Sequence, residues 1–404
     1  YRHIRTFEKI VKNYFVIYIK INEKFSMEYG DFILRETAAC ISSCMSEKQR
    51  VYKLMADEFL ILDVSSDDTK EAGKLFIKIR ESIDQFVEEN DFEVMYTISG
   101  GSLALHSSEN IEYSKVMKLT DFSLNEAKKR GRNRCYIFDE KDYGRFIRKG
   151  EITQELREAT RNGFQGFVAF YQPVIEAKSG RLSGAESLMR FSSSKFGMVS
   201  PVEFIPILEE TGLIIPVGRW MMKEAMEKCS QIRKVIPGFK VNINISQVQV
   251  SKSDVIIDIA DEMEKAGLSP EAMNIELTES DLLEGDINTQ HFLKELKRMG
   301  IKLALDDFGT GYSNFHYLSE LDPEIIKIDR SFTASAVADE KEYYLLKQFC
   351  RMIHNLGLKI CIEGVENQEE WAKIQKLEPD FGQGFFWGRP CGYDEFVRQF
   401  IEKK

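Results

Sequence analysis

Short apolar runs that each end in a polar, oxygen-bearing side chain recur through the second half of the sequence. Five runs rich in Ile, Val and Leu end in Ser, Glu or Asp, and they occupy residues 240–246, 274–279, 302–307, 325–329 and 359–363. A sixth run, 181–186, is less apolar and ends in Glu186. Apolar stretches of about four to eight residues are typical of buried strands.

Amphipathic helical patterns separate most of these runs. Alternation of strand and helix predicts an α/β fold with a parallel sheet, and this number of repeats indicates a closed βα barrel of the TIM type. The carboxyl ends of the strands lie on one face of such a barrel. Polar residues that are far apart in the sequence are therefore expected to converge on one site at its mouth.

Residues 1–140 follow a different order of elements. Strands are predicted at 15–19, 51–54, 59–64 and 94–105, and helices at 30–45, 68–89 and 114–129. This order predicts an α+β sandwich in which helices pack on one sheet. The Gly100-Gly101 pair in the last strand indicates a bulge or a close approach of another backbone.

A charged segment with two glycines, residues 141–152, follows this half and predicts a linker or a linking helix. The two predicted domains are therefore residues 1–140 and 153–404. A length of 404 residues agrees with two domains, and a hydrophobic content of 43% suffices for sizeable cores.

Charge and cysteine usage restrict the partners and the compartment. A net charge of −10 argues against non-specific binding to nucleic acid or to an anionic membrane, although it is compatible with a small anionic ligand held by metal ions. The seven cysteines and five histidines show no Cys-x-x-Cys or His-x-x-x-His spacing, so a zinc site is not expected. Reduced, buried thiols are typical of a cytoplasmic protein, which is the location that we expect.

Neither a membrane-spanning segment nor a signal peptide is expected. No apolar run reaches the roughly 18 residues that a transmembrane helix requires, and the first residues lack the pattern of a signal peptide. Because the sequence begins at Tyr1 and not at Met, we expect a fragment of a longer protein that could carry a membrane anchor or a sensor region.

Eight short segments of the second half carry a resemblance to a known family. They are Tyr171-Gln-Pro173, Glu186-Ser-Leu-Met-Arg190, Asn244-Ile-Ser246, Glu276-Leu-Thr-Glu279, Asp306-Asp-Phe-Gly-Thr-Gly311, Lys327-Ile-Asp-Arg-Ser-Phe332, Glu363-Gly-Val-Glu366 and Gln383-Gly384. They occur in the family's order and cover the whole half. The second half thus resembles an EAL domain, the phosphodiesterase of the bacterial messenger cyclic di-GMP.

The signature triplet departs from the family's usual sequence at its middle position. It reads Glu186-Ser187-Leu188, whereas the family usually has Ala in the middle. Successive strand residues point to opposite faces of a sheet, so Ser187 is expected to point away from the site. We expect the added hydroxyl to affect packing more than chemistry.

Six polar side chains are expected to ring the mouth of the barrel: Glu186, Asn244, Glu276, Asp306, Asp307 and Glu363. Each acid alone is also compatible with a solvated strand end. Two like charges about 4 Å apart repel by about 4 kcal/mol at an effective dielectric constant near 20, so five converging carboxylates need cations between them or protons on them. All-oxygen ligation suits Mg²⁺ or Mn²⁺. The resemblance implies two such ions, with Asp306 as a ligand of both.

Three further roles follow from the resemblance. Lys327 is costly to bury unless it is paired, so it either extends along the rim to water or, as the resemblance implies, holds and polarises the attacking water. Glu363 is also implied to orient this water. Glu279 is implied to anchor the glycine-rich segment 307–311, which is either a lid or a plain turn.

Substrate contacts are less sharply indicated. A guanidinium group matches phosphate oxygens, so the resemblance makes Arg190 a phosphate contact, whereas a surface salt bridge is the alternative. Gln172 and Gln383 are expected to contact the ligand or to fix the geometry of the site. Phe386 and Trp387 could stack on a base or pack in the core.

The first half resembles a GGDEF domain, the diguanylate cyclase fold. The segments that carry this resemblance are Asn22-Glu23, Tyr29-Gly-Asp31 and Ala127-Lys-Lys-Arg-Gly-Arg-Asn133. The signature reads Met55-Ala-Asp-Glu-Phe59, so Met55 and Ala56 replace two glycines that let a backbone approach a nucleotide. Tyr18 and Lys20 stand where a metal-binding Asp is expected, and the family's inhibitory Arg-x-x-Asp is absent. We therefore expect a regulatory or dimerising module that makes no cyclic di-GMP, with binding of GTP or another regulator left open.

The function expected from the whole sequence is metal-dependent hydrolysis of cyclic di-GMP to linear 5′-pGpG, in a homodimer. Three alternatives stay open: a non-catalytic receptor of the dinucleotide, an interaction protein in which both halves are relics, and a hydrolase of another cyclic dinucleotide. A receptor would normally lack a metal ligand or the lysine, and none of these residues is lost here.

Overall fold

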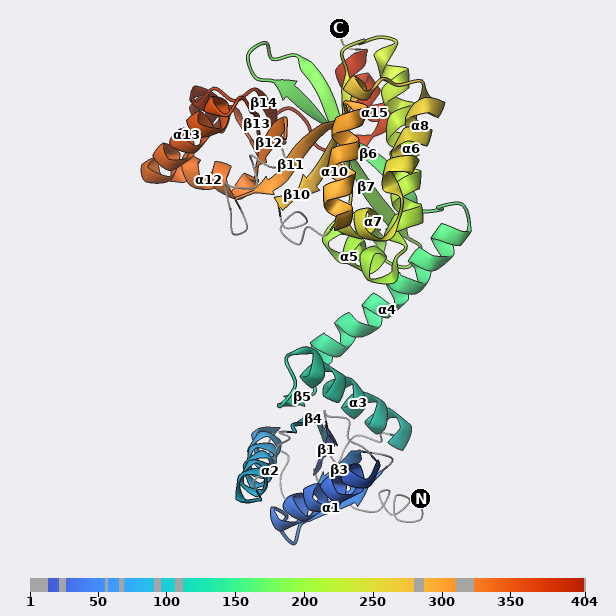
Figure 1. The fold of residues 1–404 in the computed structure, drawn as a ribbon, viewed down its shortest axis with the longest axis vertical. Coiled ribbons are helices and arrows are strands. Elements are labelled where there is room, and N and C mark those ends of the chain that lie inside the picture. The colour runs from blue at the N-terminus through green and yellow to red at the C-terminus, as the bar shows by residue number, and fades with distance from the viewer. Residues whose placement is uncertain are drawn as a thin grey trace. The chain divides into compact units, whose positions relative to one another are not determined.

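The computed structural model describes residues 14–21, 27–54, 57–64, 69–90, 96–105, 112–279, 287–309 and 323–402 (Figure 1). The chain forms two compact units, and the boundary between them in the sequence follows Arg148. This point lies inside helix α4 (Glu140–Arg161), so the segment predicted as a linker or a linking helix is helical. Among the described helices, none is both long and apolar enough to cross a bilayer.

The first unit is built on one five-stranded sheet, in the order β2-β3-β1-β4-β5. Its strands are β1 (Tyr14–Ile21), β2 (Gln49–Lys53), β3 (Glu58–Asp63), β4 (Ile98–Leu105) and β5 (Cys135–Ile137), and its helices are α1 (Met27–Ser43), α2 (Thr69–Glu89) and α3 (Tyr113–Lys129). Strand β1 pairs antiparallel with both β3 and β4. Among the described elements of this unit, the three-residue strand β5 alone has no predicted counterpart, because so short a run carries no periodic signal.

Both faces of this sheet are covered, because apolar residues of the central strands alternate between two cores. Phe59 and Ile61 of β3 pack with α1 and α2. Leu60 and Leu62 of the same strand pack with α3. The predicted α+β sandwich is therefore observed, with α1 and α2 on one face of the sheet and α3 on the other.

The Gly100-Gly101 pair marks a close approach of other elements and not a bulge. Both residues keep regular pairing with β1. A Cβ atom at Gly101 would lie 2.2 Å from the backbone nitrogen of Leu124 and 2.4 Å from the carbonyl oxygen of Thr120, both in α3. A Cβ atom at Gly100 would meet the ring of Phe76 in α2 at 2.9 Å. The pair therefore lets a helix contact each face of β4.

The second unit contains a closed barrel. Its strands, in order around the ring, are β6 (Phe167–Glu176), β14 (Phe381–Gln383), β13 (Lys359–Ile362), β12 (Ile325–Ile328), β11 (Lys302–Phe308), β10 (Met273–Thr278), β9 (Lys240–Asn244) and β7 (Leu182–Ser193). Pairing of β6 with β7 closes the ring. The predicted βα barrel is confirmed, but the expectation of an all-parallel sheet is wrong for one strand, because β6 runs antiparallel to both of its neighbours.

Helices cover the outside of this barrel (Figure 1). They are α5 (Pro201–Thr211), α6 (Ile214–Arg233), α7 (Gln247–Lys252), α8 (Val255–Ala266), α10 (Ile287–Met299), α12 (Arg330–Ala338), α13 (Glu340–Asn355), α14 (Gln368–Ile374) and α15 (Tyr393–Phe396), with the short turns η2 (Pro270–Ala272), η3 (Gln375–Leu377) and η4 (Val397–Ile401) and the short strands β8 (Gly197–Val199) and β15 (Cys391–Gly392). Local signals fix several helix ends. Ser246 and Gln249 form a capping box at the start of α7, and α8 ends at Gly267, whose φ is 64°.

Alternation along the barrel strands decides which side chains reach the interior. Val241 and Ile243 of β9 belong to the large core between strands and helices, as do Ile275 and Leu277 of β10. The residues between them point into the barrel, because successive strand residues face opposite sides. None of the seven cysteines forms a disulfide, and all but the half-buried Cys135 are buried.

We expect Gly101→Ala to destabilise the first unit. The added methyl group would overlap the backbone of α3, which cannot rotate away as a side chain can, so the loss should reach about 3 kcal/mol or more. Hydrogen exchange of the whole 404-residue chain, followed by mass spectrometry, should show faster exchange in β4 and α3.

Gly73→Ala in α2 is the matched control, because no atom lies within 4 Å of its Cβ position. This substitution should leave exchange unchanged or slow it slightly, since alanine favours a helix over glycine by about 1 kcal/mol. Equal effects of the two substitutions would contradict the close approach of α3 to β4.

Candidate functional site

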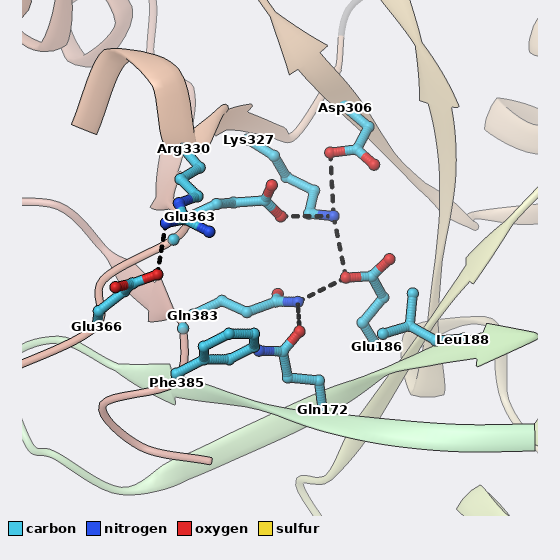
Figure 2. Close-up of a pocket in the computed structure, with 12 residues that line it drawn as sticks. Gln172, Glu186, Leu188, Asp306, Lys327, Arg330, Glu363, Glu366, Gln383 and Phe385 are labelled. Carbon is cyan, nitrogen blue, oxygen red and sulfur yellow. Dashed lines mark hydrogen bonds and ion pairs between the residues drawn. The ribbon is translucent and has the colours of Figure 1, made fainter. Parts of the chain in front are cut away.

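A cluster of ionisable side chains lies at the carboxyl ends of the barrel strands (Figure 2). Glu186 comes from β7, Glu276 from β10, Asp306 from β11 and Lys327 from β12. Glu363 directly follows β13. The structure thus brings together residues that 177 positions of sequence separate, as the barrel predicts.

Lys327 occupies the centre of this cluster and is only 1% exposed. Its Nζ lies 2.8 Å from Glu363 Oε1, 3.0 Å from Glu276 Oε2, 3.1 Å from Asp306 Oδ1 and 3.4 Å from Glu186 Oε2. Burial lowers the pKa of Lys327, but these four carboxylates outweigh burial and raise it well above the usual value. The alternative of a rim lysine that extends to water is therefore wrong.

Glu186 is held by two amide side chains as well as by Lys327. Its Oε1 accepts a hydrogen bond from Asn244 Nδ2 at 2.8 Å, and its Oε2 accepts one from Gln383 Nε2 at 2.6 Å. Burial raises the pKa of Glu186, but Lys327 and the two amide hydrogen bonds outweigh burial and hold the pKa below its usual value. Lys327 and the two amides therefore stabilise the anionic form of Glu186.

Glu276 and Glu363 are perturbed in the opposite direction. Burial, together with the neighbouring carboxylates, raises the pKa of Glu276 well above its usual value, although Lys327 opposes this shift. Burial and the carboxylates of Asp306 and Glu186 raise the pKa of Glu363 to about 8, again against the effect of Lys327. One lysine thus cannot neutralise four converging acids, and without a further cation the cluster retains protons near neutral pH.

A bulge lets two consecutive acids, Asp306 and Asp307, face the same mouth. Adjacent residues of a regular strand would point to opposite faces. The pairing of β11 with β12 shifts register between Leu305 and Phe308, and Asp307 has a left-handed φ of 52°. Its backbone N–H donates to Asp306 Oδ1 at 3.0 Å. Asp306 and Asp307 therefore offer oxygen atoms to one group together with Glu363.

The donor set fits divalent cations. One group consists of Glu186, Glu276 and Asp306, and a second consists of Asp306, Asp307 and Glu363, with the ligand atoms of each group within 4.8 Å of one another. Asp306 is common to both groups. Carboxylate oxygens at this spacing suit Mg²⁺ or Mn²⁺, and two sites with a shared carboxylate are a fitting arrangement for two ions.

Gln383 holds Glu186 directly, and Gln172 in turn holds Gln383. Gln383 Nε2, which donates to Glu186, also lies 3.1 Å from Gln172 Oε1, and Gln172 Nε2 donates to the carbonyl oxygen of Gly388 at 3.3 Å. Both glutamines also line a cavity of about 220 Å³ at the barrel mouth. They thus fix the geometry of the site and border the space open to a ligand.

The same cavity has lining residues that sequence reasoning did not single out. Arg330 and Glu366 form an ion pair of 2.6 Å at its edge, and Phe385 forms part of its wall (Figure 2). All three lie within or next to the motifs of the second half, which was the only available signal. Phe386 and Trp387 instead pack against the barrel core.

Arg190 does not line this cavity. Its guanidinium group lies over the ring of Phe170, 5.6 Å from the ring centre, and donates to the carbonyl oxygen of Met189 at 2.9 Å. Burial lowers its pKa. A phosphate contact by Arg190 stays a prediction, because these contacts do not define where a phosphate would lie.

Glu279 contacts the segment that it was expected to anchor. Its Oε2 accepts a hydrogen bond from the backbone N–H of Gly309 at 2.8 Å. Gly309 has a φ of 96°, and a Cβ atom there would meet the ring of Phe332 at 2.7 Å. Gly311, the other glycine of this segment, lies outside the described residues.

Ser187 points away from the cluster, as alternation predicts. Its buried Oγ donates to the backbone carbonyl oxygen of Asn242 at 2.8 Å. The hydroxyl that departs from the usual triplet is therefore satisfied in the packing between β7 and β9.

Comparison with known proteins agrees with this site. The EAL domain family model matches residues 153–390, and the model of the diguanylate cyclase GGDEF domain matches residues 15–134. The chain is 30% identical over 384 residues to the signaling protein YkoW of Bacillus subtilis and 28% identical over 381 residues to the bifunctional diguanylate cyclase/cyclic di-GMP phosphodiesterase MucR of Pseudomonas aeruginosa. These matches cover 95% and 93% of this chain, but 48% and 55% of the relatives, so the chain spans about half of their length.

A solved structure described as the PaMucR phosphodiesterase in complex with c-di-GMP is similar to the second unit. Its TM-score is 0.58 and its sequence identity is 29%, over 61% of this chain and 99% of that chain.

Metal binding at this cluster should depend on pH. Below a pH of about 8, a cation must displace the proton of Glu363, so this group alone should make Mn²⁺ affinity rise with pH by up to about tenfold per unit. Titration calorimetry between pH values of about 6 and 9 measures this slope. Glu363→Gln should flatten it, and a pH-independent affinity of the unmodified chain would contradict the proposed competition.

Proposed function

The chain belongs to the EAL domain family, and from this membership we propose that it hydrolyses cyclic di-GMP to linear 5′-pGpG at the mouth of its barrel. One observation carries this proposal: two three-carboxylate groups share Asp306 and surround a buried lysine. Carboxylates that can hold two cations, beside a group that can donate to water, support a metal-assisted phosphodiester hydrolysis.

The side chains divide the work as follows. Glu186, Asn244, Glu276, Asp306, Asp307 and Glu363 would hold two Mg²⁺ or Mn²⁺ ions. When bound, these ions supply Lewis acidity that activates water and offsets charge on the phosphate. Lys327 donates a hydrogen bond to the attacking water, and Glu363, 2.8 Å from Lys327 Nζ, orients it.

The water oxygen forms a bond to one phosphorus atom as the bond to the 3′ oxygen breaks. The product then carries a 5′-phosphate, and the proton ends on the released 3′-hydroxyl. Gln172, Gln383 and Arg330 border the cavity that would accept the dinucleotide. Arg190 would contribute its guanidinium group to a phosphate of the bound dinucleotide. Glu279 would hold Gly309, near the start of the glycine-rich segment.

The first unit would act as a regulatory or dimerising module without cyclase activity. The support lies in the sequence of its signature, whose Met55 and Ala56 lie outside the described residues, as do Asn22 and Glu23. Strand β1 passes through Tyr18 and Lys20, where a metal-binding Asp would be expected. A homodimer, and a GTP-like regulator bound to this unit, belong to the same proposal.

A non-catalytic receptor of cyclic di-GMP is the alternative, since relatives of this fold have been solved with this ligand bound. A receptor has no use for a buried lysine paired with four acids, because binding alone does not require water activation. The complete cluster therefore favours hydrolysis.

The purified chain should convert cyclic di-GMP to linear 5′-pGpG only when Mg²⁺ or Mn²⁺ is present, with products separated by chromatography. Glu186→Ala should abolish turnover, because it removes a ligand that Lys327, Asn244 and Gln383 hold in place. Glu210→Ala, an exposed acid paired with Lys149, is the control and should retain full activity. Unchanged turnover in excess EDTA would refute the metal-dependent mechanism.

Lys327→Met should reduce turnover by roughly 10²–10⁴-fold, the usual contribution of a group that assists proton transfer. Binding of cyclic di-GMP in the presence of Mn²⁺ should change little, because the carboxylates and the cavity wall remain. Lys359→Met, at the opposite end of the barrel where Lys359 pairs with Glu324, should leave both quantities unchanged. Near-normal turnover of the Lys327 variant would assign this lysine to charge neutralisation alone.

A further inference from the structure

Two asparagines lie inside the barrel, one level below the acidic cluster. Asn242 of β9 is 6% exposed and Asn274 of β10 is 4% exposed. They are direct pairing partners in the parallel ladder, in which the next inward pair is Asn244 and Glu276.

The two asparagines form a directed chain of hydrogen bonds that ends on Glu276. Asn274 Nδ2 donates to Asn242 Oδ1 at 2.9 Å, and Asn242 Nδ2 donates to Glu276 Oε1 at 2.8 Å. The second bond requires the NH₂ group of Asn242 to face the carboxylate. The first bond secures that orientation, because the reversed amide would place two oxygens against each other and two NH₂ groups against each other.

As a result of these hydrogen bonds, the two oxygens of Glu276 face different partners. Oε1 faces Asn242, whereas Oε2 faces the centre of the cluster, 3.0 Å from Lys327 Nζ. A carboxylate held at one oxygen has its other oxygen aimed in a fixed direction. Hydrogen bonds of this kind orient metal ligands in other proteins and are worth about 10- to 100-fold in metal affinity.

The two buried amides differ from the apolar side chains that several other strands contribute to the barrel interior. Val174, Ala304, Ile325 and Cys361 form an apolar cluster in the barrel interior on the other strands. A buried amide is unfavourable unless its hydrogen bonds are made. The Oδ1 atom of Asn274 is buried without a partner among the described residues, whereas its Nδ2 donates to Asn242.

We propose that Asn242 is a positioning residue that aims Glu276 Oε2 into the metal-binding cluster, and that Asn274 fixes the orientation of the Asn242 amide. This inference rests on the proposed function, because it gives Glu276 the task of binding a cation. Ser187 adds to the arrangement, since its hydroxyl ties the Asn242 backbone to β7.

The test compares Mn²⁺ binding by the full chain and its variants, measured by calorimetry without substrate. Asn242→Leu keeps the volume but removes the donor, and it should weaken Mn²⁺ binding by about 10- to 100-fold. Asn274→Leu should give a smaller loss, because the Asn242 amide stays in contact with Glu276 but is free to reverse. Turnover of the Asn242 variant should recover when Mn²⁺ is raised to saturation, which a merely destabilised protein would not show.

Ile243→Ala is the matched control. Its side chain is buried on the same strand, but it faces the helices and not the cluster. It should lower the melting temperature and leave Mn²⁺ affinity unchanged. If Asn242→Leu does not fold, Asn242→Ala removes the same donor without adding atoms.

The outcomes separate this inference from the proposed function. Mn²⁺ affinity of the Asn242 variants equal to that of Ile243→Ala, or an unmodified chain that binds no Mn²⁺, overturns the positioning role. If the unmodified chain binds Mn²⁺ but leaves cyclic di-GMP intact, the proposed function fails. The affinities of the variants then still decide the role of Asn242.

Discussion

The structure of the second unit depends on a balance of buried charge. Four carboxylates converge on Lys327 in the barrel, away from water. Removing a charge from water is costly, and the penalty is offset only when partners are close and well oriented. Because one ammonium group faces four acids, the balance is incomplete in the protein alone. Burial, together with this excess of negative charge, raises the pKa of Glu276 and of Glu363. The same shortage of positive charge makes the cluster a site for divalent cations.

The rest of the barrel serves to hold this cluster in place. Strand alternation sends Glu186 and Glu276 inward while Ala185 and Ile275 pack outward. Amide side chains then fix the carboxylates: Asn244 and Gln383 on Glu186, and Asn242 on Glu276. Neutral amides can donate to an anion without adding charge. They therefore orient the acids without reducing the excess of negative charge that cations would offset.

Much of this arrangement could be predicted from the sequence, because strand ends carry a simple signal. The apolar runs became barrel strands, and acids at or near the ends of several runs, among them Glu186, Asp306 and Glu363, lie together at the mouth. The reversed direction of β6 could not be predicted, since a strand's periodicity is the same in both directions. The turn that brings Asp307 to the mouth was also hidden, because a left-handed φ at an aspartate has no sequence signature of its own. Asn242 was overlooked since a short polar residue within an apolar run resembles a defect in the pattern, and its role appears only when Glu276 is placed above it.

The hydrogen bonds of Gln383 also bear on when the site can form during synthesis of the protein. This residue lies in the last strand of the barrel, and it braces Glu186, 197 residues earlier in the chain, and Gln172, 211 residues earlier. Strands β6 and β7 are neighbours in sequence and can pair as soon as they leave the ribosome. Glu186 would then lack its contact with Gln383 until nearly the whole unit has been synthesised and β14 closes the ring. A partly synthesised chain therefore carries most of the acids of the site but not the brace that orders them, so the site forms only when the barrel is complete.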